Sequence, residues 1–230
     1  WKTREKDWVL GVGSKNMLFG GGDAFVKRVG DAASDRFTSG IFTKGERKIG
    51  YVRVPQFNFS SVFTALANEL AALDGMTEGL ILDLMRNPGG SVCLTNEVLR
   101  RFIPYPFRTV GDEFRPTWSV VQQFRHDFED ADYYGASDIE HLLLEAWLKD
   151  IETAYYANRG RTGQTPACGF SLDIQPLTDS NGDPWGYDKA MIVLIDEFST
   201  SSADVFPSII QDANRALMAG QATEGGGGLS

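Results

Sequence analysis

The sequence predicts an α/β fold with a parallel sheet and a helical insertion, and two apolar runs carry that prediction. Residues 79–84 and 191–195 are short and almost continuously apolar, which is typical of parallel strands buried on both faces. Apolar residues at helical spacing over 59–73 separate the first run from an earlier alternating strand at 49–55. Strand, helix and strand in about 35 residues form a parallel crossover unit.

Composition sets limits on the class of protein. The chain has 230 residues, of which 42% are hydrophobic and 23% charged, as in an ordinary globular protein with a substantial core. The formal net charge of -9 argues against nucleic acid or an anionic membrane as the main partner. No apolar run approaches the ~20 residues of a membrane span. Cys93 and Cys168 lack metal-ligand spacing, and the sequence leaves open whether they pair.

Three segments organise the chain. Residues 1–48 lead into the core, and Trp8–Val12 within them is a possible strand. The core itself consists of residues 49–103 and 189–230. Residues 104–188 are longer than a usual connection and are predicted to be an inserted helical subdomain or lid.

The insertion contains helical patterns near 118–128 and 139–157. Its aromatic pairs, Tyr133–Tyr134 and Tyr155–Tyr156, are interpreted as packing residues. The two histidines of the chain, His126 and His141, both fall on these helical patterns. We interpret them as surface or half-buried helix positions.

Each apolar run of the core is followed by a turn that has both a structural and a functional interpretation. Met85–Gly90 is either a plain connection or a source of flexible N–H groups aimed at an anion. Ser199–Ser202 precedes a helix, where a serine is either an N-cap or a nucleophile. On local grounds the cap is the commoner role. Together the two turns supply what acyl transfer needs, a nucleophile and oxyanion donors.

Four segments in order resemble the S41 serine peptidases, the C-terminal-processing and tricorn group. They are residues 49–54, 79–90, 193–204 and 211–226. The resemblance implies a ClpP/crotonase-like spiral of strand–strand–helix units, a polypeptide substrate, and neither a metal nor an organic cofactor. It also implies an extracytoplasmic or secreted location.

Matched by position, the resemblance implies that Ser201 is the nucleophile, three residues before Asp204. Backbone N–H groups of Gly89 or Gly90, together with that of Ser202, would form the oxyanion hole. Ser199 and Ser202 are the alternative nucleophiles.

The general base departs from the processing-peptidase pattern. Gly226 stands where those enzymes carry a lysine, and no lysine follows Ser201. The chain is therefore more similar to the tricorn-like and chlamydial secreted protease branch. We expect a base outside this sequence, unless His126, His141 or Lys189 serves.

The resulting hypothesis is a serine endopeptidase that forms an acyl-enzyme on Ser201. The first alternative is a catalytically inactive S41-like module that binds a peptide or another ligand. The second is a crotonase-type acyl-CoA enzyme, which uses paired backbone N–H groups in a similar architecture.

Overall fold

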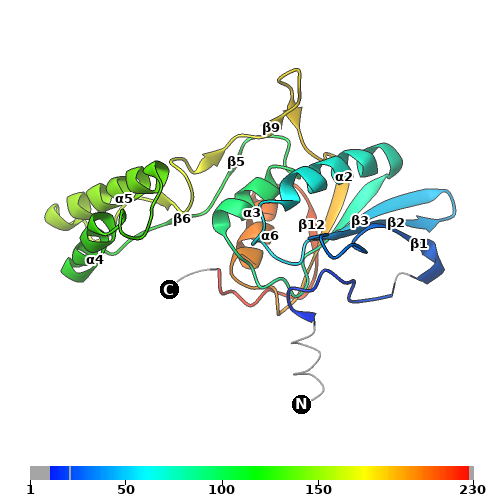
Figure 1. The fold of residues 1–230 in the computed structure, drawn as a ribbon, viewed down its shortest axis with the longest axis horizontal. Helices are drawn as coiled ribbons and strands as arrows, with labels where there is room; N and C mark the ends of the chain where they lie inside the picture. The colour runs from blue at the N-terminus through cyan, green and yellow to red at the C-terminus, as the bar shows by residue number, and fades with distance from the viewer. Residues whose placement is uncertain (1–10, 21, 228–230) are drawn as a thin grey trace, which may run out of the picture. The chain divides into compact units, whose positions relative to one another are not determined.

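The computed structural model describes residues 11–20 and 22–227 (Figure 1). The chain forms two compact units, residues 1–108 with 173–230 and residues 109–172. Of the possible strand at 8–12, residues 8–10 lie outside the described residues, whereas Gly11 and Val12 have helix and turn backbone and not the expected strand. The domain limits expected from the sequence stay a prediction, because compactness alone does not define an independently folding segment.

A six-stranded sheet forms the centre of the first unit, in the order β1-β2-β3-β4-β11-β12. The pairs β1–β2 and β2–β3 are antiparallel, whereas β3–β4, β4–β11 and β11–β12 are parallel. The strands are β1 (Phe25–Val29), β2 (Thr38–Lys44), β3 (Arg47–Arg53), β4 (Gly79–Asp83), β11 (Ala190–Ile195) and β12 (Leu217–Gly220). The chain thus has a mixed α/β fold with both parallel and antiparallel pairing.

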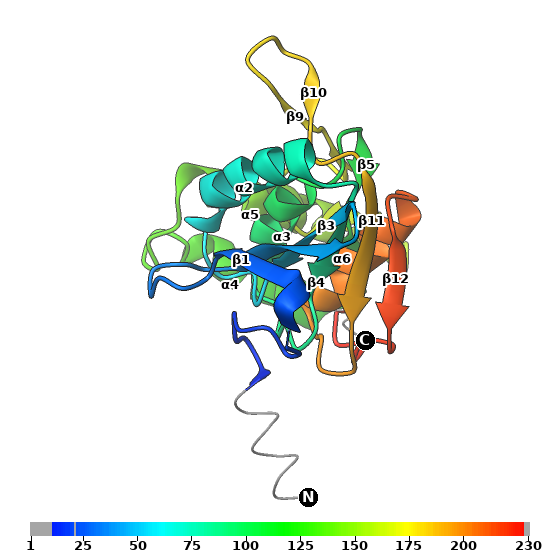
Figure 2. The ribbon, with the colours of Figure 1, turned by 90° about the vertical axis from the view of Figure 1, so that its right-hand side faces the viewer.

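Among the described residues, this unit contains the helices α2 (Val62–Met76), α3 (Val92–Leu99) and α6 (Ser202–Asp212). Figure 2 shows α2 running along one face of the sheet. Leu66, Leu70 and Leu73 of α2 are fully buried, as is Leu82 of β4. The Phe57 ring stacks on Phe206 of α6 at 5.5 Å between centroids. The contact between Phe57 and Phe206 positions α6, the helix that follows β11.

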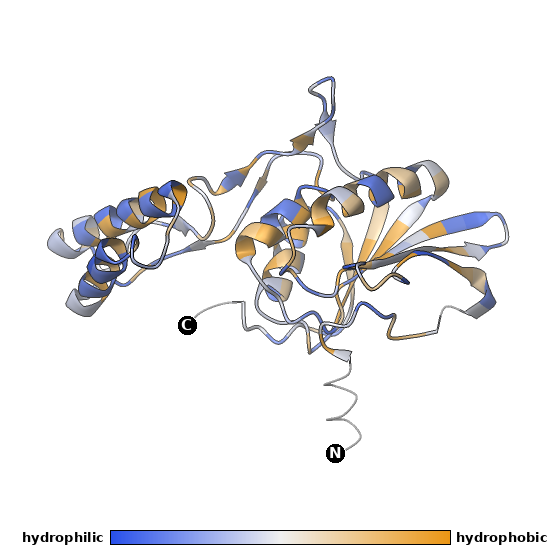
Figure 3. Cartoon of the chain, viewed as in Figure 1, coloured by the Kyte–Doolittle hydropathy of each residue, from blue (hydrophilic) through white to orange (hydrophobic). Residues whose placement is uncertain are grey.

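The opposite face of the sheet is only partly covered. Near β1 and β2, Tyr51 packs edge-on against Phe25 and Phe42. On the far strands, Ile192 is 41% exposed and its register partner Leu217 is 73% exposed. The predicted burial of residues 191–195 on both faces is therefore wrong at Ile192, where the described residues leave one side open. Figure 3 shows the apolar character of the strands.

Strands β1 and β2 were not expected from the sequence. Their pairing depends on a close approach at Gly40, where an added Cβ would lie 2.2 Å from the ring of Phe25. A short 3-10 helix, η1 (Gly22–Ala24), leads into β1. Strands are predicted from alternating apolar side chains, and glycine has no side chain to contribute to that pattern. The sequence around Gly40 therefore did not indicate a strand.

The second unit contains the two helices α4 (Trp118–Glu129) and α5 (Asp138–Tyr156), which confirm the helical patterns of the insertion. A capping box between Ser137 and Glu140 begins α5. Short strands β6 (Gly111–Asp112) and β7 (Thr165–Pro166) pair beside the helices.

Two more short pairs belong to the first unit. They are β5 (Phe107–Arg108) with β8 (Asp173–Ile174), and β9 (Leu177–Thr178) with β10 (Pro184–Trp185). Among the described residues no cysteine is free, and Cys93 and Cys168 are both disulfide-bonded.

Candidate active site

Ser201 occupies a turn with unusual backbone geometry at the start of α6. Its φ of 56° and ψ of -123° lie outside the regions that L-residues prefer, and its side chain is exposed. It is the N-cap residue of α6, yet its hydroxyl makes no capping hydrogen bond. The capping interpretation of this hydroxyl is therefore wrong. A strained conformation of this kind costs about 1–3 kcal/mol and persists only where the surroundings impose it.

The hydroxyls of the two neighbouring serines are engaged in hydrogen bonds, buried at Ser199 and partly buried at Ser202. Ser199 is fully buried, with its Oγ 3.0 Å from the carbonyl oxygen of Leu84 and 3.1 Å from Asp196 Oδ1. Ser202 is 1% exposed and its Oγ donates to the carbonyl oxygen of Gly90 at 2.6 Å. Of these three serines, Ser201 is the one with an accessible hydroxyl.

The glycine turn after β4 packs directly against the serine turn. An added Cβ at Gly89 would lie 2.6 Å from the Thr200 carbonyl oxygen and 2.8 Å from Ser201 Cβ. Gly89 also has a φ of 87°. Both the space and the conformation therefore require glycine here. The structure thus brings together the two turns that the sequence singled out.

The backbone N–H groups of this region divide into engaged and unengaged donors. Gly89 N–H donates to Asn87 Oδ1 at 2.8 Å. Phe57 pairs with the backbone on either side of Gly90, through the Gly89 carbonyl and the Ser91 N–H. Within the part of the chain that the structure describes, the N–H groups of Gly90 and Ser202 have no hydrogen-bond partner. These two N–H groups are the ones available to an added anion.

Asn87 fixes the glycine turn and was missed in the sequence. It is fully buried, and its Nδ2 donates to the Val54 carbonyl at 3.0 Å. Its own carbonyl oxygen accepts the Thr200 N–H at 3.0 Å. The side chain and backbone of Asn87 thus join the residue that follows β3, the glycine turn and the serine turn.

Asp196 makes a second link between the turns that sequence reasoning missed. It is 5% exposed and its Oδ1 accepts the N–H groups of Arg86 at 2.8 Å and Phe198 at 3.2 Å. The partners lie in two segments more than a hundred residues apart in sequence. No local spacing indicates such a contact.

Asp204 holds the glycine loop that follows β12. Its Oδ1 accepts the N–H of Gly225 at 2.9 Å, and its Oδ2 accepts that of Gly227 at 2.8 Å. An added Cβ at Gly226 would lie 2.8 Å from Thr200 Oγ1. The loop therefore passes next to the serine turn, with Asp204 as a positioning residue on α6.

A buried polar group lies where β3 and β4 end. Arg53 and Asp83 form an ion pair at 3.0 Å, with both side chains fully buried. Tyr51 Oη donates to Asp83 Oδ2 at 2.5 Å. Burial, and then the charge of Asp83, raise the pKa of Tyr51 above its ordinary value of 10.0, so this hydroxyl keeps its proton. Asp83 Oδ1 in turn accepts the N–H of Met85, the first residue of the glycine turn.

The model of peptidase family S41 matches residues 48–230. The chain belongs to this family.

Curated relatives include proteins of two chlamydial species. A protein of Chlamydia trachomatis serovar D is 27% identical over 210 residues, covering 79% of this chain and 34% of the relative. An uncharacterized protein of Chlamydia muridarum is 26% identical over 204 residues, with the same two coverages. The chain therefore spans about a third of the length of these relatives.

Solved structures share the fold. Mature CPAF aligns with a TM-score of 0.70 at 23% identity, covering 96% of this chain and 46% of that chain. Mature CPAF complexed with lactacystin gives 0.69 at 22%, covering 95% and 46%. A putative peptidase from Parabacteroides merdae gives 0.52 at 18%, covering 83% and 45%. Because all three identities are below 25%, these likenesses show a shared fold and nothing more.

Lys189 is excluded as the base of this S41 site. Its ammonium group donates to the carbonyl oxygens of Asp74 and Thr77, the latter at 2.9 Å. It precedes β11, whereas Ser201 follows that strand. Six residues at about 3.3 Å each separate the two ends of β11 by about 20 Å.

The two histidines both lie in the second unit, and each is paired locally. His126 Nδ1 lies 3.1 Å from Asp130 Oδ2, and His141 Nε2 lies 2.8 Å from Asp132 Oδ1. His126 is exposed and His141 half-buried, as expected for helix-surface positions. The first unit contains no histidine in its sequence.

A pocket of about 480 Å³ lies at the ends of β4 and β11 in the first unit. Met85, Arg86, Ile195 and Phe198 contribute to its lining. The Arg86 guanidinium lies 5.4 Å from the centroid of the Phe198 ring.

Among the described residues, no group of three histidine, cysteine or acidic side chains is placed to hold a metal ion. No helix of the described residues is long and apolar enough to span a bilayer.

Proposed function

We propose that this chain carries the nucleophile and oxyanion hole of a serine endopeptidase. The observation that carries the proposal is the position of Ser201. Its exposed hydroxyl stands on a strained turn next to two unengaged backbone N–H groups, those of Gly90 and Ser202. An accessible serine beside paired donors is the arrangement that acyl transfer requires.

In the proposed mechanism, Ser201 Oγ attacks the carbonyl carbon of the scissile peptide bond while a base takes the hydroxyl proton. The carbonyl oxygen becomes an oxyanion and accepts hydrogen bonds from Gly90 and Ser202. The carbon–nitrogen bond then breaks, the amine leaves with a proton from the protonated base, and an acyl-enzyme remains. Water hydrolyses this ester and regenerates Ser201. Loss of one oxyanion donor typically lowers the rate about 10²–10³-fold.

Gly89 takes a supporting part in this proposal. The sequence offered either Gly89 or Gly90 as a donor, but the N–H of Gly89 is occupied by Asn87. We therefore assign the donor to Gly90. Because Gly89 has no side chain, the glycine turn can approach Ser201 closely.

The general base in this proposal comes from outside the described residues. The first unit has no histidine, and Lys189 is held at the other end of β11. Each histidine of the second unit is paired with an aspartate of its own unit. Replacing both histidines with asparagine in the intact protein tests this assignment, which predicts that the reactivity of Ser201 stays unchanged.

The family resemblance extends the proposal to architecture, substrate and location. Helices α2 and α6 each connect adjacent parallel strands, which supports a crotonase-like spiral of strand–helix units. The proposed substrate is a polypeptide and the proposed location is extracytoplasmic or secreted. Cell fractionation of the native host tests the location.

The function is tested by incubating the intact protein with a mixture of unfolded polypeptides and identifying new termini by mass spectrometry. We expect new termini that disappear with Ser201→Ala. Binding without cleavage by the intact, folded protein would instead support the inactive peptide-binding module.

A further inference from the structure

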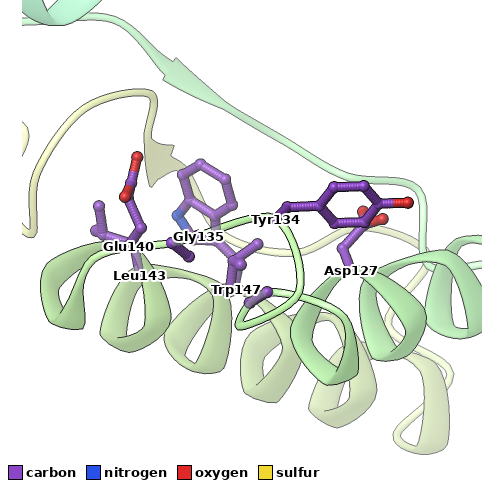
Figure 4. A pocket seen from close by; sticks show the side chains of 9 residues that line it. Asp127, Tyr134, Gly135, Glu140, Leu143 and Trp147 are labelled. Carbon is purple, nitrogen blue, oxygen red and sulfur yellow. The ribbon is translucent and has the colours of Figure 1, made fainter.

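The second unit contains a hollow of about 410 Å³ between α4, α5 and the loop that joins them. Its lining includes the apolar and aromatic residues Tyr134, Leu143, Leu144 and Trp147, together with the carboxylates of Asp127 and Glu140. In the view of Figure 4, the two carboxylates lie toward opposite ends of the hollow, with the Trp147 ring between them. This volume and this mostly apolar lining are typical of a ligand site.

The two helices and the loop that form the hollow also carry exposed apolar side chains. Tyr133 is 85% exposed and Tyr134 76%, while Ile139 and Leu142 on one face of α5 are 62% and 54% exposed. The interpretation of Tyr133 and Tyr134 as packing residues is therefore wrong. Tyr156, at the end of α5, is also 67% exposed. Apolar patches of this kind mark interaction surfaces.

The charge of this region selects the kind of partner. Residues 127–140 contain six carboxylates and neither lysine nor arginine. The preceding Arg125 is already engaged, because its Nε donates to Glu152 Oε1 at 2.6 Å. Hydrogen bonds from the backbone and side chain of Ser137 lower the pKa of Glu140, which keeps this carboxylate ionised at neutral pH. The hollow is thus both apolar and negative.

We propose that this hollow binds a basic segment of a polypeptide partner. An arginine or lysine side chain enters it, with its charged group near Asp127 at one end of the hollow or near Glu140 at the other. The aliphatic stem of that side chain packs on Leu143 and Leu144, and the cation gains from the faces of Trp147 and Tyr134. The same charges repel acidic segments and nucleic acid. This site does not depend on the proposed peptidase function.

The test uses the intact protein with Ser201→Ala, so that a bound peptide is not cleaved. The probe is a fluorescent eight-residue peptide that alternates arginine and leucine, and anisotropy measures its binding. We expect binding that weakens as salt is raised. A peptide with citrulline in place of arginine keeps the shape without the charge, and we expect it to bind about tenfold or more weakly.

Two double variants separate the site from general charge. Asp127→Asn with Glu140→Gln removes both lining carboxylates, while glutamine at 140 still suits the capping box. Glu129→Gln with Asp138→Asn removes the same net charge from the same two helices outside the lining. We expect the first pair to weaken binding about tenfold and the second less than twofold. Tyr134→Ser, at a largely exposed position, should weaken binding several-fold, and circular dichroism checks that the helices remain.

Several outcomes would overturn the proposal. One is equal binding of the arginine and citrulline peptides. Another is equal weakening by the two double variants. Tight binding of a glutamate–leucine peptide, or absence of binding by the folded protein at low salt, would also contradict it.

Discussion

The hydroxyl of Ser202 donates a hydrogen bond of 2.6 Å to the carbonyl oxygen of Gly90, 112 residues earlier in the chain. This bond joins the serine turn to the glycine turn, alongside the bond from Thr200 N–H to the Asn87 carbonyl. The two residues it connects are the ones whose N–H groups we propose as oxyanion donors. The Ser202 hydroxyl therefore helps to hold the backbone N–H groups of Gly90 and Ser202 in place.

Ser202→Ala should lower the free energy of unfolding by about 1–3 kcal/mol, because it leaves the half-buried Gly90 carbonyl without its partner. It should slow, without abolishing, the reaction of Ser201 with a serine-directed probe. Chemical denaturation measures the first effect and the labelling rate the second. Ser208→Ala is the control, since Ser208 Oγ bonds only the Asp204 carbonyl of its own helix. Equal effects of the two substitutions would contradict the role given to Ser202.

Gly89→Ala should remove the reactivity of Ser201 and destabilise the fold by about 2 kcal/mol or more. A methyl group there meets the Thr200 carbonyl at 2.6 Å, and the φ of 87° adds backbone strain. Gly45→Ala is the matched control in the same unit, because Gly45 has a φ of 61° but open space around its Cα. It should cost about 1–2 kcal/mol and leave labelling unchanged. Loss of labelling in both variants would point to strain in general.

The sequence predicted the parallel part of the sheet well, because each parallel strand is an apolar run joined to an amphipathic helix. It also identified the two turns, since glycine and serine clusters at strand ends are local features. It missed β1 and β2, whose packing uses a glycine in place of an apolar residue. It also overestimated burial at Ile192, because an apolar run does not reveal that one face is open.

The contacts that hold the site could not be predicted in the same way. Asn87 and Asp196 act on segments far away in the sequence, so no spacing indicates them. The engagement of Gly89 N–H by Asn87 depends on the conformation of the Asn87 side chain, which no sequence pattern indicates. Matching the sequence to the family by position indicated Ser201 as the nucleophile. Its exposed hydroxyl and its unusual φ are properties of the folded chain, which the sequence does not reveal.

Asp204→Asn should loosen the glycine loop while leaving Ser201 in place. Both carboxylate oxygens of Asp204 accept backbone N–H groups, from Gly225 and Gly227. Asparagine offers one acceptor and places an NH₂ against the other N–H. We expect a loss of about 1–3 kcal/mol, and faster hydrogen exchange at these two glycines. Unchanged exchange at both would rule out the positioning role.

Asp83→Asn should be the most destabilising of these substitutions, at about 3–5 kcal/mol, because it leaves the fully buried Arg53 without a counter-charge. Thermal and chemical unfolding measure the effect. Asp31→Asn is the control, since Asp31 pairs with Lys27 and its side chain is 85% exposed. That change should cost less than about 1 kcal/mol. Arg53 Nε also donates to the Ser14 carbonyl at 2.8 Å, but this neutral oxygen supplies no counter-charge. A similar small effect for both would contradict the stabilising role given to the Arg53–Asp83 pair.

The most direct measurement of the central claim is the site of reaction with a fluorophosphonate. The intact protein is treated with the probe, digested, and mapped by mass spectrometry, with Ser201→Ala and Ser208→Ala in parallel. We predict one adduct, on Ser201, that is absent in Ser201→Ala and present in Ser208→Ala. An adduct on Ser199 or Ser202, an unchanged adduct in Ser201→Ala, or no adduct on the folded protein would contradict the assignment of Ser201 as an activated nucleophile.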